Sequence, residues 1–409
     1  MSLRALLLDF NSYFASVEQH LRPELRGRPV GVLPVLAETS CCIAASIQAK
    51  RCGVKTGTGV ADARRLCPDI VFVQARPRIY VEMHHRLMGI VDTVIAVSEV
   101  LSIDEVACDL TGSWQQEGVV RELARTVKAR LRDQVGAVLT CSIGIGPNRF
   151  LAKTASNMQK PDGLVILHQE DLPDCLFSLK LRDLNGIAHA TQERLERHGI
   201  LTVAALCAAS REQLRSVWGG VEGERMYDRL RGVDVVPQPT RRSSLGHSHV
   251  LPPRLRHEAG AYAVLSKLTQ KAALRLRAEG YLAGRLRVSV SYRKHPEWEK
   301  ETRFAPMQAT LACLKLVDAL WDARPRRREP IKVGMAFSDL VSSDRVSLSL
   351  FPDTTSALDT ALDRVRLKFG SEALYFGGAF LAQEEAPMRI AFTHIPDLTL
   401  EVEPRRASK

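Results

Sequence analysis

Residues 3–18 read LRALLLDFNSYFASVE, an apolar run that ends in an acid and then changes its periodicity. The run at 3–10 is typical of a β-strand, and Ser12–Leu21 is compatible with a helix. Asp9 therefore ends a strand at the point where the chain turns into a helix. A single acid in this position is more often solvated or capping the helix, so Asp9 alone does not identify a site.

Two further acids, Asp104 and Glu105, are adjacent in SIDE, at the turn of a segment that reads as two strands (residues 91–110). Adjacent carboxylates in an apolar strand context repel each other unless a cation lies between them. Mg²⁺ is the natural cation, because it prefers oxygen ligands and can share them with a phosphate. Asp9, Asp104 and Glu105 are therefore candidate metal ligands.

Strands alternate with helices as far as residue 165. The periodicity predicts a helix at 116–133, a strand at 137–145 and a helix at 148–159. This order indicates an α/β catalytic unit over roughly 1–165. The piece between about 20 and 76, rich in Gly and small residues, reads as a separable insertion.

Residues 166–235 change to short helices and contain LNGIAHATQERLERHGI, which is similar to a helix-hairpin-helix. In such a hairpin, a turn containing glycine presents backbone N–H groups to a phosphate, which makes Gly186 a candidate DNA contact. The usual second glycine is Ala188 here, and a plain helical hairpin is the alternative.

After a polar linker, residues 243–345 read β-α-β-β-α-β. Within this region Arg285, Arg287 and Arg293 alternate with apolar residues, so one face of a strand would be basic and the other apolar. Such a sheet can pack inward while it contacts phosphates outward. Arg242, just before this region, is a further candidate DNA contact.

The net charge of +11 is not spread evenly. Residues 241–345 hold 21 Lys and Arg residues against 10 Asp and Glu residues, so about a quarter of the chain carries the whole excess. A basic domain next to a neutral one indicates a polyanionic partner. A solvated basic face kept for solubility is the alternative on charge alone.

Nine cysteines form no CxxC pair and have no histidine at zinc-ligand spacing, which favours reduced thiols over a structural metal site. The longest apolar run near the start, residues 5–8, is far too short for a signal peptide or a membrane span. We therefore expect a cytoplasmic protein without a membrane partner.

Several motifs together resemble those of the Y-family DNA polymerases, the group of the bacterial lesion-bypass polymerases IV and V. The first is DFNSYFASVE at 9–18 and the second is SIDE at 102–105. The others follow in the same order and spacing: AKRCGVK at 49–55, SIGIGPN at 142–148, LAKTASNMQKPDG at 151–163, the hairpin at 183–199 and LGHSHVLPP at 245–253. The resemblance covers residues 3–380.

The resemblance implies an α+β multidomain fold, a right-hand polymerase with palm, small fingers, helical thumb and little finger. The implied domains are a palm at 1–20 and 76–165, fingers at 21–75, a thumb with the helix-hairpin-helix at 166–235, the β-α-β-β-α-β little finger at 243–345, and a C-terminal tail at 346–409. It also implies template-directed, error-prone translesion synthesis of the SOS response to DNA damage, with primer–template DNA and a dNTP as substrates.

The same resemblance assigns catalytic residues. It implies that Asp9, Asp104 and Glu105 bind two Mg²⁺ ions, with Mn²⁺ as an alternative, and that the carbonyl of Phe10 is a backbone ligand. Phe14 falls on the family's steric gate, an aromatic ring beneath the sugar that excludes a 2′-hydroxyl. Without the motif, a core aromatic on a helix face would be the better interpretation of Phe14.

The implied nucleotide-binding residues are Tyr13, Lys50 and Lys160. Lys50 stands where many relatives have an Arg, and it offers a point charge rather than a fork. Ile47 replaces a Tyr that would donate a hydrogen bond to the triphosphate, and Arg51 could partly compensate. Asn11 replaces an Asp of many relatives, although the polymerase V branch shares this Asn. These departures concern substrate selectivity rather than the chemistry.

The tail contains SLSLF at 347–351, which resembles the peptide that bacterial proteins insert into the sliding clamp. It predicts clamp contacts by Ser347, Leu348, Leu350 and Phe351, with an edge strand as the alternative. Later parts of the tail resemble the catalytic subunit of polymerase V, whose relatives work with an accessory protein and a recombinase filament.

Two other functions fit parts of the pattern. A catalytically silent, clamp-tethered DNA-binding scaffold would keep the basic domain, but it has no need for all three acids. A nucleotidyl cyclase also places acids at a first strand and a hairpin, but it holds no duplex and needs neither the helix-hairpin-helix nor the basic domain. The polymerase is therefore the preferred hypothesis.

Overall fold

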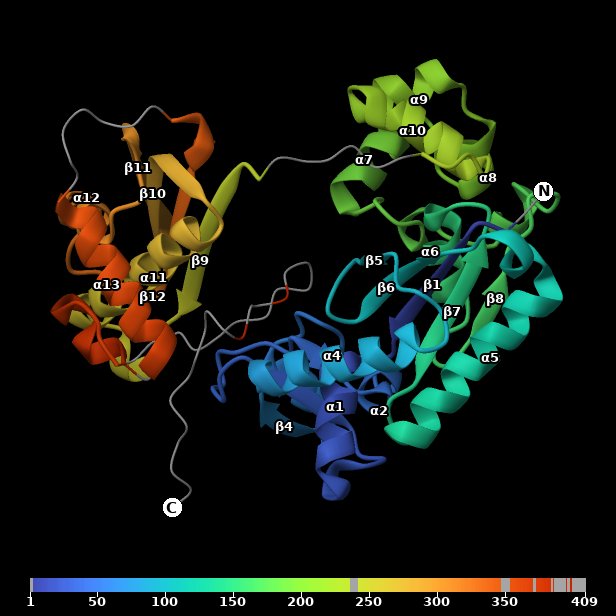
Figure 1. Cartoon of the computed structure of the whole chain (residues 1–409), viewed down its shortest axis with the longest axis horizontal. Coiled ribbons are helices and arrows are strands. Elements are labelled where there is room, and N and C mark those ends of the chain that lie inside the picture. Colours follow the sequence, from blue (N-terminus) through green and yellow to red (C-terminus); the bar gives the residue numbers. More distant parts are fainter. Residues whose placement is uncertain are drawn as a thin grey trace. The chain divides into compact units, whose positions relative to one another are not determined.

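The computed structural model describes residues 3–235, 242–346, 354–370 and 373–383, together with positions 385, 395 and 398. The chain forms two compact units that divide near residue 238. Figure 1 colours the first unit mainly blue to green and the second mainly yellow to red.

A five-stranded sheet with the order β5-β6-β1-β7-β8 forms the centre of the first unit. β1 (Ala5–Phe10) lies in the middle of the sheet and pairs antiparallel with β6 and β7. All of its residues are buried, which is why it reads as a continuous apolar run rather than an alternating one. The other strands are β5 (Glu99–Val100), β6 (Glu105–Asp109), β7 (Cys141–Gly146) and β8 (Leu164–Ile166).

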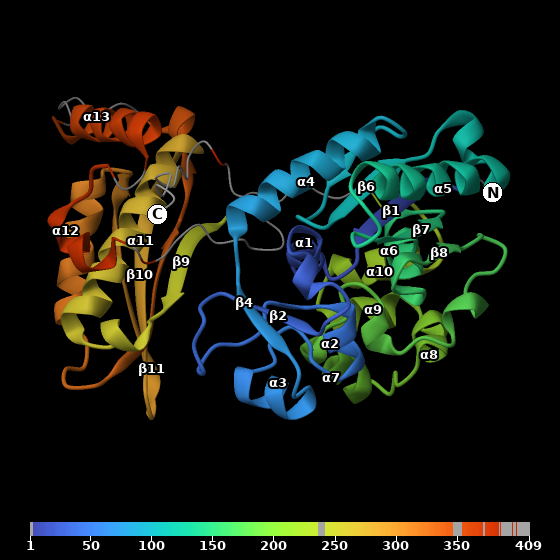
Figure 2. The ribbon, with the colours of Figure 1, turned by 90° about the horizontal axis from the view of Figure 1, so that it is seen from below.

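Helices cover both faces of this sheet. α6 (Arg149–Met158) packs closely on β7, since a Cβ on Gly144 would lie 2.0 Å from the carbonyl oxygen of Ala152. α4 (Pro77–Asp92) and α5 (Glu117–Gln134) lie next to each other on the opposite side, as Figures 1 and 2 show. α1 (Tyr13–Leu21) follows β1 directly, after a sharp turn at Ser12, whose φ is 50°. This turn directs the first helix away from the end of the sheet.

Residues 21–75, predicted to be the fingers, contain a small sheet with the order β3-β2-β4 and a hydrophobic cluster of their own. The elements are β2 (Val30–Leu33), β3 (Ala44–Ala45), α2 (Ile47–Arg51), α3 (Val60–Leu66) and β4 (Val71–Gln74). Ser46 caps α2 by accepting a hydrogen bond from the backbone N–H of Ala49 at 3.2 Å.

Residues 166–235, predicted to be the thumb, are mainly helical and pack around an apolar cluster that also includes Phe150, Leu151 and Ala155 of α6. The helices are α7 (His189–Arg197), α8 (Val203–Ala208), α9 (Arg211–Trp218) and α10 (Val221–Leu230). Gly186, in the turn before α7, has a φ of +85°, a conformation that favours glycine. This turn belongs to the predicted helix-hairpin-helix.

The second unit has the predicted β-α-β-β-α-β order. Its strands form a sheet with the order β11-β10-β12-β9, and two helices pack on one face. The elements are β9 (Ser244–Val250), α11 (Glu258–Ala278), β10 (Tyr281–Tyr292), β11 (His295–Met307), α12 (Thr310–Asp322), β12 (Pro330–Ser338) and β13 (Val341–Ser342). Leu286, Val288 and Val290 are fully buried in the core, whereas Arg287 points to the other face. The predicted alternation along β10 is confirmed.

A further helix, α13 (Thr354–Phe369), and a short 3₁₀ helix, η7 (Gly377–Ala382), continue the second unit. Asp363 accepts two hydrogen bonds from Arg277 of α11, at 2.6 and 2.8 Å, and η7 packs along the same helix. The tail was predicted to start at residue 346. Its described helices nevertheless belong to the same compact unit as the predicted little finger.

Three other observations bear on the predictions. Within the segment 91–110, β5 and β6 pair antiparallel around a turn as predicted, but α4 continues to Asp92 and β5 has only two residues. All nine cysteines are free thiols. In the part of the chain that the structure describes, no helix is long and apolar enough to span a membrane.

Candidate active site

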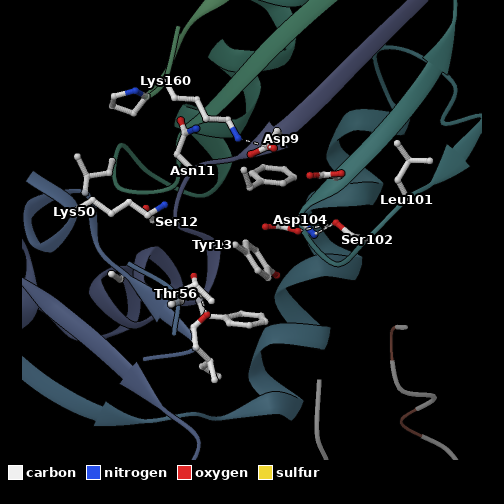
Figure 3. Close-up of a pocket in the computed structure, with 18 of the residues that line it drawn as sticks. Asp9, Asn11, Ser12, Tyr13, Lys50, Thr56, Leu101, Ser102, Asp104 and Lys160 are labelled. Carbon is white, nitrogen blue, oxygen red and sulfur yellow. Dashed lines mark hydrogen bonds and ion pairs between the residues drawn. The ribbon is translucent and has the colours of Figure 1, made fainter. Parts of the chain in front are cut away.

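The three acids line one cavity at the end of the central sheet, and Figure 3 labels two of them, Asp9 and Asp104. Asp9 of β1 is the direct register partner of Glu105 on β6. Asp104 precedes β6, and its carbonyl oxygen accepts a hydrogen bond from the backbone N–H of Phe10 at 2.8 Å. Pairing between β1 and β6 therefore brings together acids that are almost a hundred residues apart in the sequence.

Two of the acids face a lysine. The ammonium group of Lys160 lies 2.6 Å from a carboxylate oxygen of Asp9, and Lys153 of α6 pairs with Glu105. Asp104 instead accepts a hydrogen bond from the hydroxyl of Ser102 at 2.6 Å. In this structure Asp9 and Glu105 are thus each balanced by a separate lysine.

Burial raises the pKa of Asp9 to about 6, although the nearby Lys160 acts in the opposite direction. Burial also raises the pKa of Asp104, while the hydrogen bond from Ser102 opposes that shift and the charge of Glu105 adds to it. Carboxylates held close together in a partly dry site favour the uptake of a proton or a cation. Raised pKa values of this kind are typical of functional sites.

Among the described residues, no three His, Cys, Asp or Glu side chains gather closely enough to hold a metal ion. Asp9 and Glu105 are turned to their lysine partners instead. The donor set nevertheless fits Mg²⁺, because carboxylate oxygens from Asp9, Asp104 and Glu105 are at neighbouring strand ends and are the hard ligands that this ion prefers. The assignment of these acids as metal ligands remains a prediction.

A cavity of about 850 Å³ opens beside the acids. Phe14 and Lys50 line it along with the acids, and Asn185 from the predicted thumb also reaches it. Figure 3 shows Lys50 on the opposite side of the cavity from Asp104. A space of this size suits a drug-sized ligand such as a nucleotide.

Tyr13 and Phe14 of α1 line this cavity and contact Tyr80 of α4. Phe14 is almost fully buried, and its ring stacks on that of Tyr80 with a centroid distance of 4.6 Å and an angle of 18° between the planes. Tyr13 donates a hydrogen bond from its hydroxyl to the carbonyl of Tyr80 at 2.6 Å. The hydroxyl of Tyr13 is therefore already engaged, whereas Phe14 lines the cavity as a plain ring.

The predicted nucleotide-binding lysines both line the cavity. Burial lowers the pKa of Lys50, and the charge of Lys160 lowers it further, so the two ammonium groups repel each other. An anionic ligand between them would relieve this repulsion. Ile47 and Arg51 line the same cavity.

Asn11 holds the loop that carries Lys160. Its side-chain oxygen accepts hydrogen bonds from the backbone N–H of Asp162 at 2.8 Å and from the hydroxyl of Thr140 at 3.0 Å. Its side-chain amide donates to the hydroxyl of Ser142 at 3.0 Å. Asn11 therefore connects three segments of the chain around the site, a task that needs both a donor and an acceptor.

Replacing Asn11 with Ala is expected to lower the free energy of unfolding by about 2–3 kcal/mol, because it leaves buried polar groups without partners. Urea unfolding followed by circular dichroism measures this loss. Asn157→Ala, at an exposed position of α6, is the matched control and should change stability by less than about 0.5 kcal/mol. Equal stability of the two variants would contradict the bridging role of Asn11.

The predicted DNA contacts of the second unit lie on or near its outer sheet face. Arg285 and Arg287 both pair with Glu301, and Arg293 pairs with Glu329. Arg242 pairs with Glu279. These arginines are therefore balanced by carboxylates in this structure.

The clamp-like peptide lies outside the described residues. This applies to all four of its predicted contact residues, namely Ser347, Leu348, Leu350 and Phe351.

Sequence reasoning missed two features of the site. Lys153 lies within the motif at 151–163, but no role was predicted for it. Sequence reasoning also overlooked Tyr80, on which Phe14 rests. The spacing of Tyr80 and His84 on one face of α4 was an available signal, because two polar aromatics at i and i+4 on a buried helix face require partners.

Comparisons with known proteins agree on one family. Residues 8–157 match the model of the impB/mucB/samB family, and residues 242–350 match the model of the C-terminal domain of the same family. The chain is 34% identical over 386 residues to DNA polymerase IV of Moorella thermoacetica, covering 90% of this chain and 94% of that protein. It is 30% identical over 398 residues to DNA polymerase IV 1 of Bacillus subtilis, covering 93% of each chain.

Solved structures show the same fold. A Y-family DNA polymerase chimera of Dbh and Dpo4 matches with a TM-score of 0.71 and 23% sequence identity, covering 83% of this chain and 99% of that chain. A post-insertion binary complex of Dbh DNA polymerase matches with a TM-score of 0.55 over the same shares. At this level of identity the likeness concerns the fold alone.

Proposed function

The chain belongs to the impB/mucB/samB family and is a DNA-directed DNA polymerase of the Y family, and we propose that it copies damaged templates through a two-metal site formed by Asp9, Asp104 and Glu105. The observation that carries the proposal is the pairing of β1 with β6, which places Asp9, Asp104 and Glu105 on neighbouring strand ends in the lining of a cavity of about 850 Å³. The relatives named DNA polymerase IV support translesion synthesis as the role of the enzyme.

Asp9, Asp104 and Glu105 would hold the ions, together with the backbone carbonyl of Phe10. When bound, two Mg²⁺ ions would activate the primer 3′-hydroxyl and stabilise charge on the triphosphate. Family membership indicates dependence on divalent metals in general, and the oxygen donor set favours Mg²⁺ over softer ions. Mn²⁺ is the alternative, because it accepts the same ligands.

The lysines of the cavity would bind the dNTP. Lys160 pairs with Asp9 in this structure, and it would exchange that carboxylate for triphosphate oxygens once a cation balances Asp9. Lys50, across the cavity, would contact the same group. Tyr13 would contribute through its backbone and ring, since its hydroxyl donates to Tyr80. Phe14 would exclude a 2′-hydroxyl from the sugar.

Primer extension on templates with and without an abasic site tests the proposal. We expect short, low-processivity extension on the undamaged template and insertion opposite the abasic site at a comparable rate. A high-fidelity replicative polymerase is the control that should stop before the abasic site. Extension that also stops there, with full activity on the undamaged template, would contradict the translesion role.

Primer–template DNA is the expected macromolecular partner. The second unit would contact its phosphates through basic surface residues. Arg285, Arg287 and Arg293 come from one alternating stretch at β10, and Arg242 precedes β9. Gly186 would contact phosphates separately, through the hairpin of the first unit. Contacts of this kind give binding that weakens with salt and shows little sequence preference.

Arg287→Ala is expected to weaken duplex binding about equally for all sequences and to reduce the slope of log K against log salt by about 1. Arg287 is half exposed, and its pairing with Glu301 would be exchanged for a phosphate contact. Fluorescence anisotropy with labelled duplexes at several salt concentrations measures both quantities. Arg364→Ala, an exposed arginine of α13, is the matched control. Equal salt slopes for both variants and the wild type would remove Arg287 from the interface.

The sliding clamp is proposed as a further partner, because residues 347–351 resemble a clamp-binding peptide. An accessory protein or a recombinase filament is proposed on the resemblance of the tail to the catalytic subunit of polymerase V. A pull-down with the purified clamp, with Leu350→Ala and Phe351→Ala together as the variant, tests the first of these partners. Undiminished capture of the double variant would contradict the peptide assignment.

A further inference from the structure

Glu18 is a fully buried carboxylate of α1 that lies outside the cavity described above. Arg76 binds it with two hydrogen bonds, from Nε at 3.0 Å and from Nη2 at 2.6 Å. The hydroxyl of Tyr80 donates a third hydrogen bond, at 2.7 Å, and Arg22 lies 3.5 Å away. A bidentate arginine and a hydroxyl together satisfy the carboxylate and define its orientation.

This cluster lies where the predicted fingers leave and rejoin the predicted palm. Arg22 directly follows α1, and Arg76 directly precedes α4. The segment 21–75 is thus connected to the rest of the unit by two crossings, and Glu18 contacts an arginine at each of them. We call Glu18, Arg76 and Arg22 the fingers clasp.

Tyr80 links the fingers clasp to the cavity. Its hydroxyl is held by Glu18, its carbonyl accepts a hydrogen bond from Tyr13, and its ring stacks on Phe14 at 4.6 Å. Tyr80 has no exposed surface, and both burial and the charge of Glu18 raise its pKa, so the hydroxyl stays protonated and able to donate. Phe14 therefore rests on a ring whose hydroxyl end is held by a buried carboxylate, which in turn pairs with the partly exposed Arg76.

We propose that Glu18 and Arg76 are positioning residues for sugar selection, because they fix Tyr80 and thereby the height of Phe14 beneath the nucleotide. The proposal rests on the proposed function of Phe14 as the steric gate. A ring that excludes a single hydroxyl group must be placed within a fraction of an ångström, since a shift of its support by about 1 Å can change rates by up to about a hundredfold. The fingers clasp supplies that placement from outside the site.

If the Glu18–Arg76 ion pair only stabilised the fold, its loss would affect the two kinds of nucleotide equally. Breaking a buried ion pair lowers stability, because the remaining partner is left buried and uncompensated. Loss of stability alone reduces the amount of active enzyme, and it lowers the rates with deoxynucleotides and ribonucleotides by the same factor. The ratio of the two rates therefore separates positioning from stability.

The experiment measures kcat/KM for dCTP and for CTP opposite a template guanine in the full-length wild type and in three variants. Glu18→Gln keeps the size of the side chain but removes its charge, and Tyr80→Phe keeps the ring but removes the hydroxyl. We expect each to lower the preference for dCTP over CTP by about tenfold. The double variant should lose no more of this preference than either single variant, because both changes remove the hydrogen bond between Tyr80 and Glu18.

A matched control lies on the same helix. Arg78 and Glu82 form an exposed ion pair on α4, with 2.9 Å between their charged atoms. Arg78→Gln breaks a pair of the same type without contact to Tyr80, and it should leave the preference for dCTP unchanged. Circular dichroism and the active fraction from pre-steady-state bursts establish that each variant is folded. If Glu18→Gln does not fold, Tyr80→Phe still tests the link, since it leaves the ion pair intact.

Unchanged sugar preference in active Glu18→Gln and Tyr80→Phe enzymes would overturn the positioning proposal. The proposal would also be overturned if the preference for dCTP fell in the double variant by the product of the two factors measured in the single variants. Failure of the proposed function gives a different pattern: the wild type would show no extension, or Phe14→Ala would still reject CTP. In the Phe14→Ala background, Glu18→Gln should have no further effect, because the ring that it positions is gone.

Discussion

An Asp104→Ala variant is expected to lose primer extension by about a thousandfold or more while it binds duplex DNA like the wild type. Asp104 directly precedes β6, next to the strand pair that aligns Asp9 with Glu105. Its removal takes away one of three proposed metal ligands but leaves the basic face of the second unit unchanged. Rapid-quench extension and fluorescence anisotropy measure the two properties separately.

Asp109→Ala is the matched control for this variant. Asp109 ends the same strand, is exposed and pairs with Arg149 rather than with a residue of the cavity. Its loss should change extension by less than about threefold, as for an ordinary surface position. Comparable extension by the Asp104→Ala enzyme would contradict the metal assignment, and a simultaneous loss of duplex binding would indicate damage to the fold instead.

A Phe14→Ala variant is expected to accept ribonucleotides, with a fall of about a hundredfold in the preference for dNTP over the matching rNTP. Phe14 lines the cavity, and the stack on Tyr80 prevents the ring from moving away from it. The proposed gate acts by steric exclusion, so removing the ring should raise kcat/KM for rNTP more than it lowers kcat/KM for dNTP. Single-nucleotide insertion assays with both substrates measure this change.

Phe14→Tyr is the control, because it retains a six-membered ring at the same height. It should keep most of the discrimination, whereas a smaller side chain should not. A Phe14→Ala enzyme that still rejects ribonucleotides would return Phe14 to the alternative interpretation, that of a core aromatic on a helix face.

Much of the fold could be predicted because its elements have local signals. The apolar run at 3–10 is a central strand buried on both faces, and the alternation along β10 divides a core face from a solvent face. Only the first part of the segment 91–110 was predicted incorrectly, and the reason is physical. Val91 is fully buried at the end of α4, and a short apolar run suits a buried helix end as well as a strand.

The acids of the site could be predicted because each stands in a recognisable motif. Their lysine partners could not, since the pairing of Lys153 with Glu105 depends on how α6 packs against the sheet. The same holds for Glu18, whose partner Arg76 is 58 residues away in the sequence. An ion pair between residues on either side of an inserted segment leaves no periodic pattern around either residue.

The most direct test of the central claim is single-turnover insertion of each of the four dNTPs opposite each template base, first with Mg²⁺ and then with EDTA. We expect the purified protein to add the complementary nucleotide in preference to the other three, EDTA to abolish addition, and excess Mg²⁺ to restore it. Addition that ignores the template base, or that continues in EDTA, would contradict a metal-dependent, template-directed site at Asp9, Asp104 and Glu105.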